Sequence, residues 1–285
     1  MRRRAALCGI ALLVLSPAVP AQTPAGPLRV ITLAPNLAEL VCAAGACGEL
    51  VAVSAYSDFP ESLKTLPQIG DGFAVNYEAV LAQKPDLVLA WDGGTPPAAS
   101  ARLSQLGVNV LPITTRHLDD VADALHELGI RLGTGATADA AAQAYRSRLA
   151  ALRARWQAAP PIRVVYQLGT SPAYVIGGGS PIDEALRLCG GVNVFGDQPQ
   201  AALSVSAESL LAAHPEAVIY GGEDNADAMR RYWQRLPGAV AYKMGNLYEV
   251  DADRMARATP RMLDGVEQLC MRLDEARAKR AASQK

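Results

Sequence analysis

An internal repeat limits the folds open to this chain more than any other feature of its sequence. The segment VNYEAVLAQKPDLV (75–88) aligns without a gap to VSAESLLAAHPEAV (205–218), at an offset of 130 residues. Six of the fourteen positions are identical, and most of the others are similar in kind. The repeat predicts two copies of one structural unit in a single chain.

Each copy has the pattern of a capped helix followed by a buried strand. Asn76 and Ser206 are suited to be N-caps, because a short polar side chain there can accept a hydrogen bond from a free backbone N–H. Each helix is expected to end before a proline, Pro85 or Pro215, since proline cannot continue a helix. An apolar segment follows each proline, LVLAW in the first copy and AVIYG in the second.

A long helix is predicted between the two copies, from Thr137 to Gln157. Its apolar residues recur at spacings of 4 and 3, the period of one buried helix face. They are Ala138, Ala142, Tyr145, Leu149, Leu152 and Trp156. Thr137 is the expected N-cap, and Pro160 and Pro161 end the helix. A helix of this length spans about 30 Å, enough to brace two lobes.

The surrounding segments predict an α/β fold of two similar Rossmann-like lobes, joined by that backbone helix, with the ligand cleft between the lobes. Segments 28–33 and 162–168 are apolar and β-rich, and each precedes a turn and a helix that ends in a glycine, Gly45 or Gly190. Ligands of open α/β sheets bind at the carboxyl ends of the strands, so two facing lobes would share a cleft. The expected domains are an N-terminal lobe (22–133), a connecting helix (134–160), a C-terminal lobe (161–275) and a charged tail (276–285).

The N-terminus predicts export from the cytoplasm. Residues 1–21 contain three arginines, an apolar run from Ala5 to Leu15 and small residues before Gln22, which is the pattern of a signal peptide cleaved after Ala21. The alternative is a membrane anchor, but the apolar run is shorter than the roughly 18 residues that a span requires. Cleavage leaves a formal charge of −4, from 24 basic and 28 acidic residues, and no basic patch for nucleic acid.

Four cysteines remain after cleavage, an even number in an oxidising compartment. They are Cys42, Cys47, Cys189 and Cys270. Three pairings are open from sequence alone, and pairing within each lobe avoids a bridge across a mobile cleft. A zinc site is disfavoured because no pair has the short C-x-x-C spacing, and the three histidines also lack metal-ligand spacing. We expect no metal site and no cofactor apart from the ligand.

Glu78 and Glu208 occupy the same position of the first helical turn in the two copies. One interpretation is that each carboxylate only stabilises its helix dipole. The other is that a pseudo-symmetric molecule presents one glutamate on each lobe to a two-fold partner that carries cations.

Aromatic residues are expected at the rim of the cleft. Tyr56 and Trp91 precede the turns that begin at Asp58 and Asp92, and Tyr174 lies near a strand end in the second lobe. Single aromatics at such positions are often core residues, but several on one cleft favour a large, partly apolar ligand. No catalytic motif such as G-x-S-x-G, H-E-x-x-H or a Walker loop is present, so we expect a protein that is not an enzyme.

Several motifs together resemble the periplasmic vitamin B12-binding proteins of cobalamin ABC importers, within the wider group of substrate-binding proteins with a helical backbone. These motifs are VITLAPNLAEL, VSAYSDFP, NYEAVLAQKPDLVLAWDGG, LRLCGGVNVF and RATPR, in the same order from about Val30 to Cys270. The resemblance implies two lobes with little opening and closing, a corrinoid held in the cleft, and delivery to a permease and ATPase complex in the inner membrane. It implies a periplasmic protein. We also expect a monomer, and the charge balance given above predicts that it binds no nucleic acid.

The resemblance also implies roles for particular residues. Tyr56 and Trp91 match aromatics that line the corrinoid cleft, and Tyr174 stands where the family has a phenylalanine. Glu78 and Glu208 match the glutamates that dock onto arginines of the permease. Cys189 and Cys270 match the family's disulfide.

The sequence departs from the family pattern at several cleft positions. One family tryptophan falls near Gly72, where Phe73 is the nearest aromatic, and another falls at Ala202. Arg254 replaces an aromatic, and we expect Arg254 and Arg257 to meet carboxylate or phosphate groups of the ligand.

Two other functions therefore stay open. One is a haem or ferric-siderophore carrier of the same class. The other is a periplasmic cofactor-processing enzyme, for which Asp58, Asp92 and Asp251 are the candidate nucleophiles or bases.

Overall fold

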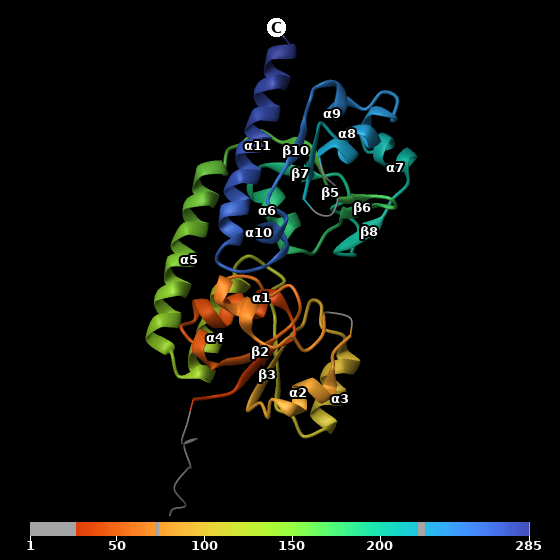
Figure 1. The fold of residues 1–285 in the computed structure, drawn as a ribbon. Coiled ribbons are helices and arrows are strands. Elements are labelled where there is room, and N and C mark those ends of the chain that lie inside the picture. Colours follow the sequence, from red (N-terminus) through yellow and green to blue (C-terminus); the bar gives the residue numbers. More distant parts are fainter. Residues whose placement is uncertain (1–26, 72–73, 222–225, 285) are drawn as a thin grey trace, which may run out of the picture.

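A computed structural model describes residues 27–71, 74–221 and 226–284. Two α/β lobes lie one above the other and are joined along one side by helix α5 (Gly135–Trp156) (Figure 1). The proposed signal peptide and Phe73 lie outside the described residues. Within the described ranges, no helix combines the length and apolar character that crossing a membrane requires.

The N-terminal lobe is built on a four-stranded parallel sheet of order β2-β1-β3-β4. Its strands are β1 (Val30–Thr32), β2 (Leu50–Val53), β3 (Leu87–Trp91) and β4 (Val110–Ile113). Its helices are α1 (Pro35–Ala43), α2 (Tyr77–Ala82), α3 (Pro97–Gln105) and α4 (Asp120–Leu132), with short 3-10 helices at Cys47–Glu49 and Glu61–Thr65. The predicted strand 87–91 is confirmed as β3.

The C-terminal lobe has a larger, mixed sheet of order β10-β9-β5-β6-β8, with β7 also paired to β5. Its strands are β5 (Ile162–Thr170), β6 (Ala173–Ile176), β7 (Gly191–Asn193), β8 (Ala202–Ser204), β9 (Ala217–Tyr220) and β10 (Leu247–Glu249). Its helices are α6 (Pro181–Leu188), α7 (Ala207–Ala212), α8 (Ala226–Gln234), α9 (Val240–Lys243), α10 (Ala252–Ala256) and α11 (Met262–Ser283). The β5–β6 hairpin adds antiparallel strand pairs, whereas strands β1 to β4 of the N-terminal lobe pair in parallel.

The sequence repeat is also a structural repeat. Asn76 caps α2 by accepting a hydrogen bond from the Ala79 N–H at 3.0 Å, and Ser206 caps α7 by accepting one from the Ser209 N–H at 3.1 Å. The residue before each repeated proline, Lys84 or His214, has a positive φ, 48° and 45° respectively. Residues other than glycine rarely adopt this left-handed backbone conformation, so its presence in both copies shows that they share backbone geometry as well as sequence.

Helix α5 buries the six residues whose spacing predicted it, from Ala138 to Trp156. The helix begins at Gly135, however, and Thr137 is not its N-cap. Helix α4 ends at Leu132, and its C-cap Gly133, with a φ of 72°, reverses the chain at once, so that α5 starts two residues earlier than expected.

The buried core is continuous between the lobes. Its largest cluster includes Leu40 of α1, Leu149 of α5 and Leu263 of α11, and so runs from one lobe through the connecting helix into the other. Two smaller clusters cover the other face of each sheet. The lobes therefore share one core along the side of α5.

Helix α11 extends through the segment that was expected to be a charged tail. It continues to Ser283 and buries Ala276 and Arg277. The Arg277 guanidinium donates to the carbonyl oxygens of Pro160 and Cys189, which ties this part of the helix to the C-terminal lobe. A disulfide between Cys189 and Cys270 fixes this helix to the end of α6. A second disulfide joins Cys42 and Cys47 within the first lobe, so both bridges lie within lobes.

Candidate functional site

An apolar cavity of about 280 Å³ lies between the two lobes. The N-terminal lobe contributes Trp91, Gly93, Thr115 and Arg116. The C-terminal lobe contributes Leu168, Ile176, Gly179, Ser180, Pro181, Ile182, Ala201, Ala202, Met255, Ala256 and Ala258. Trp91, Thr115 and Ile176 lie at the ends of β3, β4 and β6 or just after them, which is where the α/β architecture predicted the cleft. The first turn of α6 and the last turn of α10 complete the wall.

Trp91 is the largest side chain of the cavity wall and is held in place from several sides. Its indole Nε1–H donates to the Thr115 hydroxyl at 2.9 Å, and its backbone N–H donates to the Thr95 hydroxyl at 2.9 Å. The following turn lies against the ring, since a Cβ on Gly93 or Gly94 would come within 2.8 or 2.3 Å of ring atoms. Trp91 therefore offers a preorganised aromatic surface to a ligand.

The two predicted tyrosines lie outside the enclosed cavity. Tyr174 is 44% exposed on β6, and the alternation of side chains along a strand puts it on the same face as Ile176 of the cavity wall. Tyr56 is 75% exposed and has a φ of 66°, an unusual conformation for a tyrosine. Ligand contact by either tyrosine stays a prediction.

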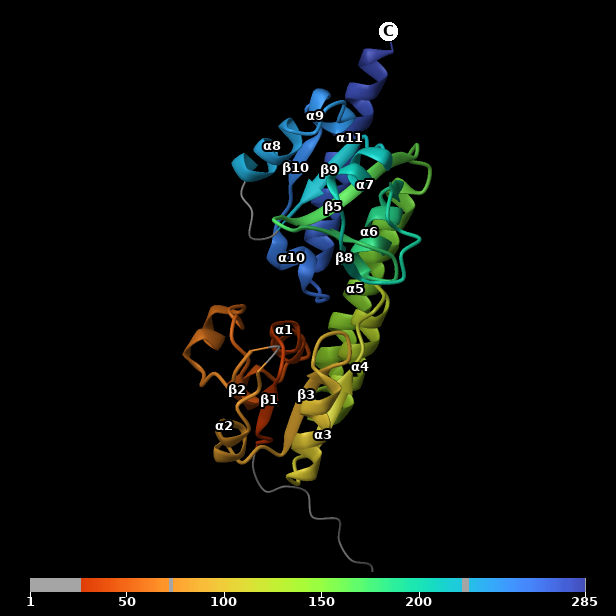
Figure 2. The same cartoon turned by 90° about the vertical axis from the view of Figure 1, so that its right-hand side faces the viewer.

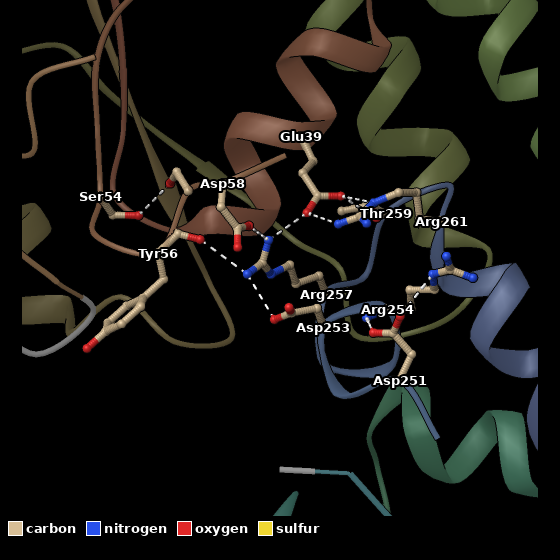
Figure 3. Close-up of polar contacts among 11 residues, drawn as sticks. Glu39, Ser54, Tyr56, Asp58, Asp251, Asp253, Arg254, Arg257, Thr259 and Arg261 are labelled. Carbon is tan, nitrogen blue, oxygen red and sulfur yellow. Dashed lines mark hydrogen bonds and ion pairs between the residues drawn. The ribbon is translucent and has the colours of Figure 1, made fainter. Parts of the chain in front are cut away.

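A network of ion pairs joins the lobes beside the cavity (Figure 3). The Glu39 carboxylate of α1 accepts hydrogen bonds from Arg257 at 2.9 Å and from two nitrogens of Arg261 at 3.0 and 2.7 Å. It also accepts one from the Thr259 hydroxyl at 3.1 Å. Glu39 belongs to the first lobe and the other three to the second, where α10 lies directly over α1 (Figure 2). We call these four residues the Glu39 junction.

Arg257 does not reach the cavity, contrary to the expectation that it meets the ligand. It is 8% exposed, and its guanidinium donates to Glu39, to Asp58 at 2.6 Å, to Asp253 at 3.0 Å and to the Tyr56 carbonyl at 3.2 Å. With its donors engaged in this way, Arg257 positions the neighbouring residues of both lobes. It holds the backbone of Tyr56 in its unusual conformation.

Arg254 also lies away from the cavity. It pairs with Asp251 at 3.1 Å and lines a separate, charged groove with Arg148, Asp264 and Glu267. The sequence placed Arg254 in the cleft because it replaces a cleft aromatic, but α10 directs its side chain towards α5 and α11.

A second polar junction links the lobes through α5. The guanidinium of Arg153 binds Asp119 of the first lobe at 2.7 Å and Glu184 of the second at 2.9 Å. Glu184 also accepts the Leu118 N–H at 2.8 Å, and the buried hydroxyl of Tyr145 donates to the Leu118 carbonyl. The Arg153 hydrogen bond is the main reason why the pKa of Asp119 lies below its ordinary value, and burial raises the pKa of Tyr145.

The three acids considered as catalytic bases each pair with an arginine. Asp58 binds Arg257, Asp92 binds Arg116 at 2.9 Å, and Asp251 binds Arg254. Burial alone would raise the pKa of Asp58, but the hydrogen bond and charge of Arg257 outweigh it and hold that pKa below its ordinary value. For Asp58 this arrangement favours a structural role, because a catalytic base needs a pKa nearer to the working pH.

Glu78 and Glu208 are both exposed, on α2 and α7. Both helices lie on the side of the molecule opposite α5, one on each lobe (Figure 1). The Glu208 backbone N–H and the Ser206 hydroxyl lower the pKa of Glu208, so this carboxylate stays charged.

Sequence reasoning missed Arg116, Thr115 and Glu39. Arg116 and Thr115 lie in the loop before α4, which the repeat does not include. Glu39 looked like an ordinary helix residue, because its partners come more than 200 positions later in the chain. The RATPR motif did mark Arg257 and Arg261, although nothing in it revealed their common partner. In the described ranges, no group of three or more His, Cys, Asp or Glu side chains could hold a metal ion.

Comparison with known proteins finds similarity along most of the chain. Residues 30–253 match the family described as periplasmic binding protein. A vitamin B12-binding protein of Vibrio cholerae is 37% identical over 243 residues, which cover 85% of this chain and 87% of the relative.

Two solved structures are also similar. The crystal structure of the periplasmic vitamin B12 binding protein of Vibrio cholerae matches with a TM-score of 0.81 and 36% identity, over 88% of this chain and 98% of that one. A periplasmic heme binding protein from Pseudomonas aeruginosa matches with a TM-score of 0.75 and 28% identity, over 86% of this chain and 91% of that one.

Proposed function

The chain belongs to the periplasmic binding proteins, a family of solute-binding proteins, and on that premise we propose that it binds cobalamin or a related corrinoid between its lobes and delivers it to an inner-membrane ABC permease. One observation carries the choice of ligand. It is the apolar interlobe cavity walled by the fixed indole of Trp91, in a chain whose relatives at 36–37% identity are named vitamin B12-binding proteins.

The cavity suits part of a large, partly apolar ligand. A corrin macrocycle with its substituents is too large for a cavity of about 280 Å³, so it would also occupy the open region between the lobes. There the exposed rings of Tyr56 and Tyr174 would add contact area. Ala202 lies in the cavity wall where the family has a tryptophan, so the contact area that this tryptophan would supply has to come from other residues.

Haem is the second candidate ligand. The similarity to a heme binding protein favours it, and so does the exposed phenol of Tyr56, since tyrosine is one of the axial ligands of haem iron. A ferric siderophore would use the same cleft.

Titration calorimetry of the mature protein with cyanocobalamin, cobinamide and haemin tests the choice. We expect sub-micromolar binding of the corrinoids. Binding of haemin alone, with an absorption spectrum that changes in the variant Tyr56→Phe, would replace corrinoid by haem as the ligand. Turnover of any bound ligand would favour the enzymatic alternative.

Delivery is proposed to depend on Glu78 and Glu208, which would bind cations of the permease, one from each lobe. The double variant Glu78→Lys/Glu208→Lys should abolish uptake in cells and keep ligand affinity within about twofold, because both side chains lie outside the cavity. The matched control reverses two other surface glutamates, Glu127 and Glu275, whose side chains are 43% and 47% exposed. Normal uptake by the first variant would refute the docking role.

We further propose that residues 1–21 direct export and are removed, and that the mature protein acts as a monomer without a cofactor of its own. Intact mass measurement of the periplasmic protein should give a chain that starts at Gln22. Light scattering should give the mass of one chain with and without ligand.

A further inference from the structure

The interlobe cavity has one ionised side chain among its described lining residues, and that side chain is Arg116. The rest of the described wall is apolar apart from the hydroxyls of Thr115 and Ser180. An ion pair between this cation and a ligand anion would be stronger beside the apolar wall than in open water, because the wall and the ligand exclude water from the contact.

The guanidinium of Arg116 is anchored but not saturated. One nitrogen, Nη2, pairs with Asp92 at 2.9 Å, while the side chain stays 60% exposed. The backbone N–H of Arg116 donates to Asp120 at 2.7 Å, which fixes the loop that carries it. Of the five N–H donors of a guanidinium, those on Nε and Nη1 have no partner among the described residues.

Asp92 is itself positioned to guide Arg116. The Thr114 hydroxyl donates to its Oδ2 at 3.3 Å, and the Asp92 N–H donates to the Ile113 carbonyl at 3.0 Å. The Asp92 side chain is 39% exposed, and Asp92 is absent from the cavity wall. The carboxylate therefore holds the guanidinium through Nη2, while Arg116 itself lines the cavity and its donors on Nε and Nη1 stay available to a ligand.

We propose that Arg116 binds the phosphodiester of a corrinoid's nucleotide loop and thereby selects complete cobalamins over corrinoids that lack the loop. This inference rests on the proposed function. A phosphodiester keeps its charge at every physiological pH and presents two oxygens to the planar fork of an arginine. An exposed ion pair such as Arg116–Asp92 contributes little by itself, so the guanidinium can shift towards the ligand at small cost.

The test compares cyanocobalamin with dicyanocobinamide, which lacks the nucleotide loop and its phosphate. Both are titrated into wild type, Arg116→Gln, Arg116→Lys and Asp92→Asn. We expect wild type to prefer cyanocobalamin. Arg116→Gln should lose about tenfold or more in affinity for cyanocobalamin and at most about twofold for cobinamide. Arg116→Lys should recover part of the loss, since it keeps the charge but not the fork.

The Asp92→Asn variant separates ligand binding from a merely structural ion pair. It removes the competing charge and keeps the shape, so affinity for cyanocobalamin should stay the same or rise. A structural pair predicts that Arg116→Gln and Asp92→Asn weaken both corrinoids alike, and that result would overturn the inference.

Failure of the inference can be told apart from failure of the proposed function. If wild type binds both corrinoids and Arg116→Gln lowers the affinity for both equally, or for neither, the phosphodiester role is wrong and corrinoid binding stands. If wild type binds neither corrinoid but binds haemin, both are wrong, and the carboxylates of haem would be the anions that Arg116 meets.

Discussion

Removing the charge of Glu39 is the sharpest test of how the lobes are held together. The variant Glu39→Gln keeps the size of the side chain but takes one negative charge from a site where that side chain is only 3% exposed. Three hydrogen bonds from two guanidinium groups and one from a hydroxyl end on this carboxylate. All four come from the opposite lobe, so the change acts directly on the contact between lobes.

The expected loss follows from what the two arginines retain. Breaking a buried ion pair costs about 3–5 kcal/mol when the remaining charge is left without a partner. Arg257 keeps Asp58 and Asp253, and Arg261 is 24% exposed with its guanidinium 3.7 Å from the ring centroid of Phe59. Both arginines thus stay partly compensated, and we expect the free energy of unfolding to fall by about 2–3 kcal/mol.

Urea unfolding followed by circular dichroism measures this loss, with Glu275→Gln as the matched control. Glu275 pairs with Arg272 at 2.8 Å, a similar distance, but its side chain is 47% exposed. The control should cost less than about 0.5 kcal/mol, because water screens an exposed pair. Equal costs for the two variants, or a more stable Glu39→Gln protein, would refute the claim that the Glu39 junction stabilises the structure.

Three further predictions concern the cavity wall, the C-terminal helix and the α5 junction. Trp91→Ala should weaken ligand binding about tenfold or more in calorimetry, on the ~1–3 kcal/mol scale of a buried aromatic contact; unchanged affinity would place the indole outside the site. Replacing Cys189 and Cys270 by serine should lower the free energy of unfolding by up to about 4.5 kcal/mol in chemical denaturation, because their bridge closes a loop with a sequence separation of 81. The same change at Cys42 and Cys47, with a separation of 5, should cost about 2 kcal/mol. Arg153 holds the pKa of Asp119 below its ordinary value of 3.8, so on acidification the unfolded chain binds this proton first and stability falls below about pH 3.8. The free energy of unfolding of Asp119→Asn should therefore decrease less steeply with falling pH than that of wild type. Equal slopes for the two proteins would contradict the assignment.

Local patterns in the sequence were sufficient to predict most of the fold. The spacing of apolar residues predicted which face of α5 is buried, and Asn76 and Ser206 cap their helices as expected. These features depend on residues a few positions apart, where helix geometry alone decides which side chains meet.

The site was predicted less completely, because its contacts join distant parts of the chain. Trp91 was expected at the cleft and lines it. Arg257 was expected at the ligand, whereas the structure pairs it with Glu39, which lies 218 positions away, and no periodicity in the sequence connects the two. Arg116 was missed for a related reason, since a cation in a loop reaches a cavity wall only once both lobes are in place.

The single core described above has a thermodynamic consequence. Molecules built from two separate lobes can melt in two steps, each lobe losing its structure at its own temperature. Here Leu149 belongs to the same cluster as Leu40 and Leu263, and neither lobe can expose its interior without stripping the shared face of α5. Heating should therefore give one calorimetric peak whose van't Hoff and calorimetric enthalpies agree, as for a small protein with one cooperative unit.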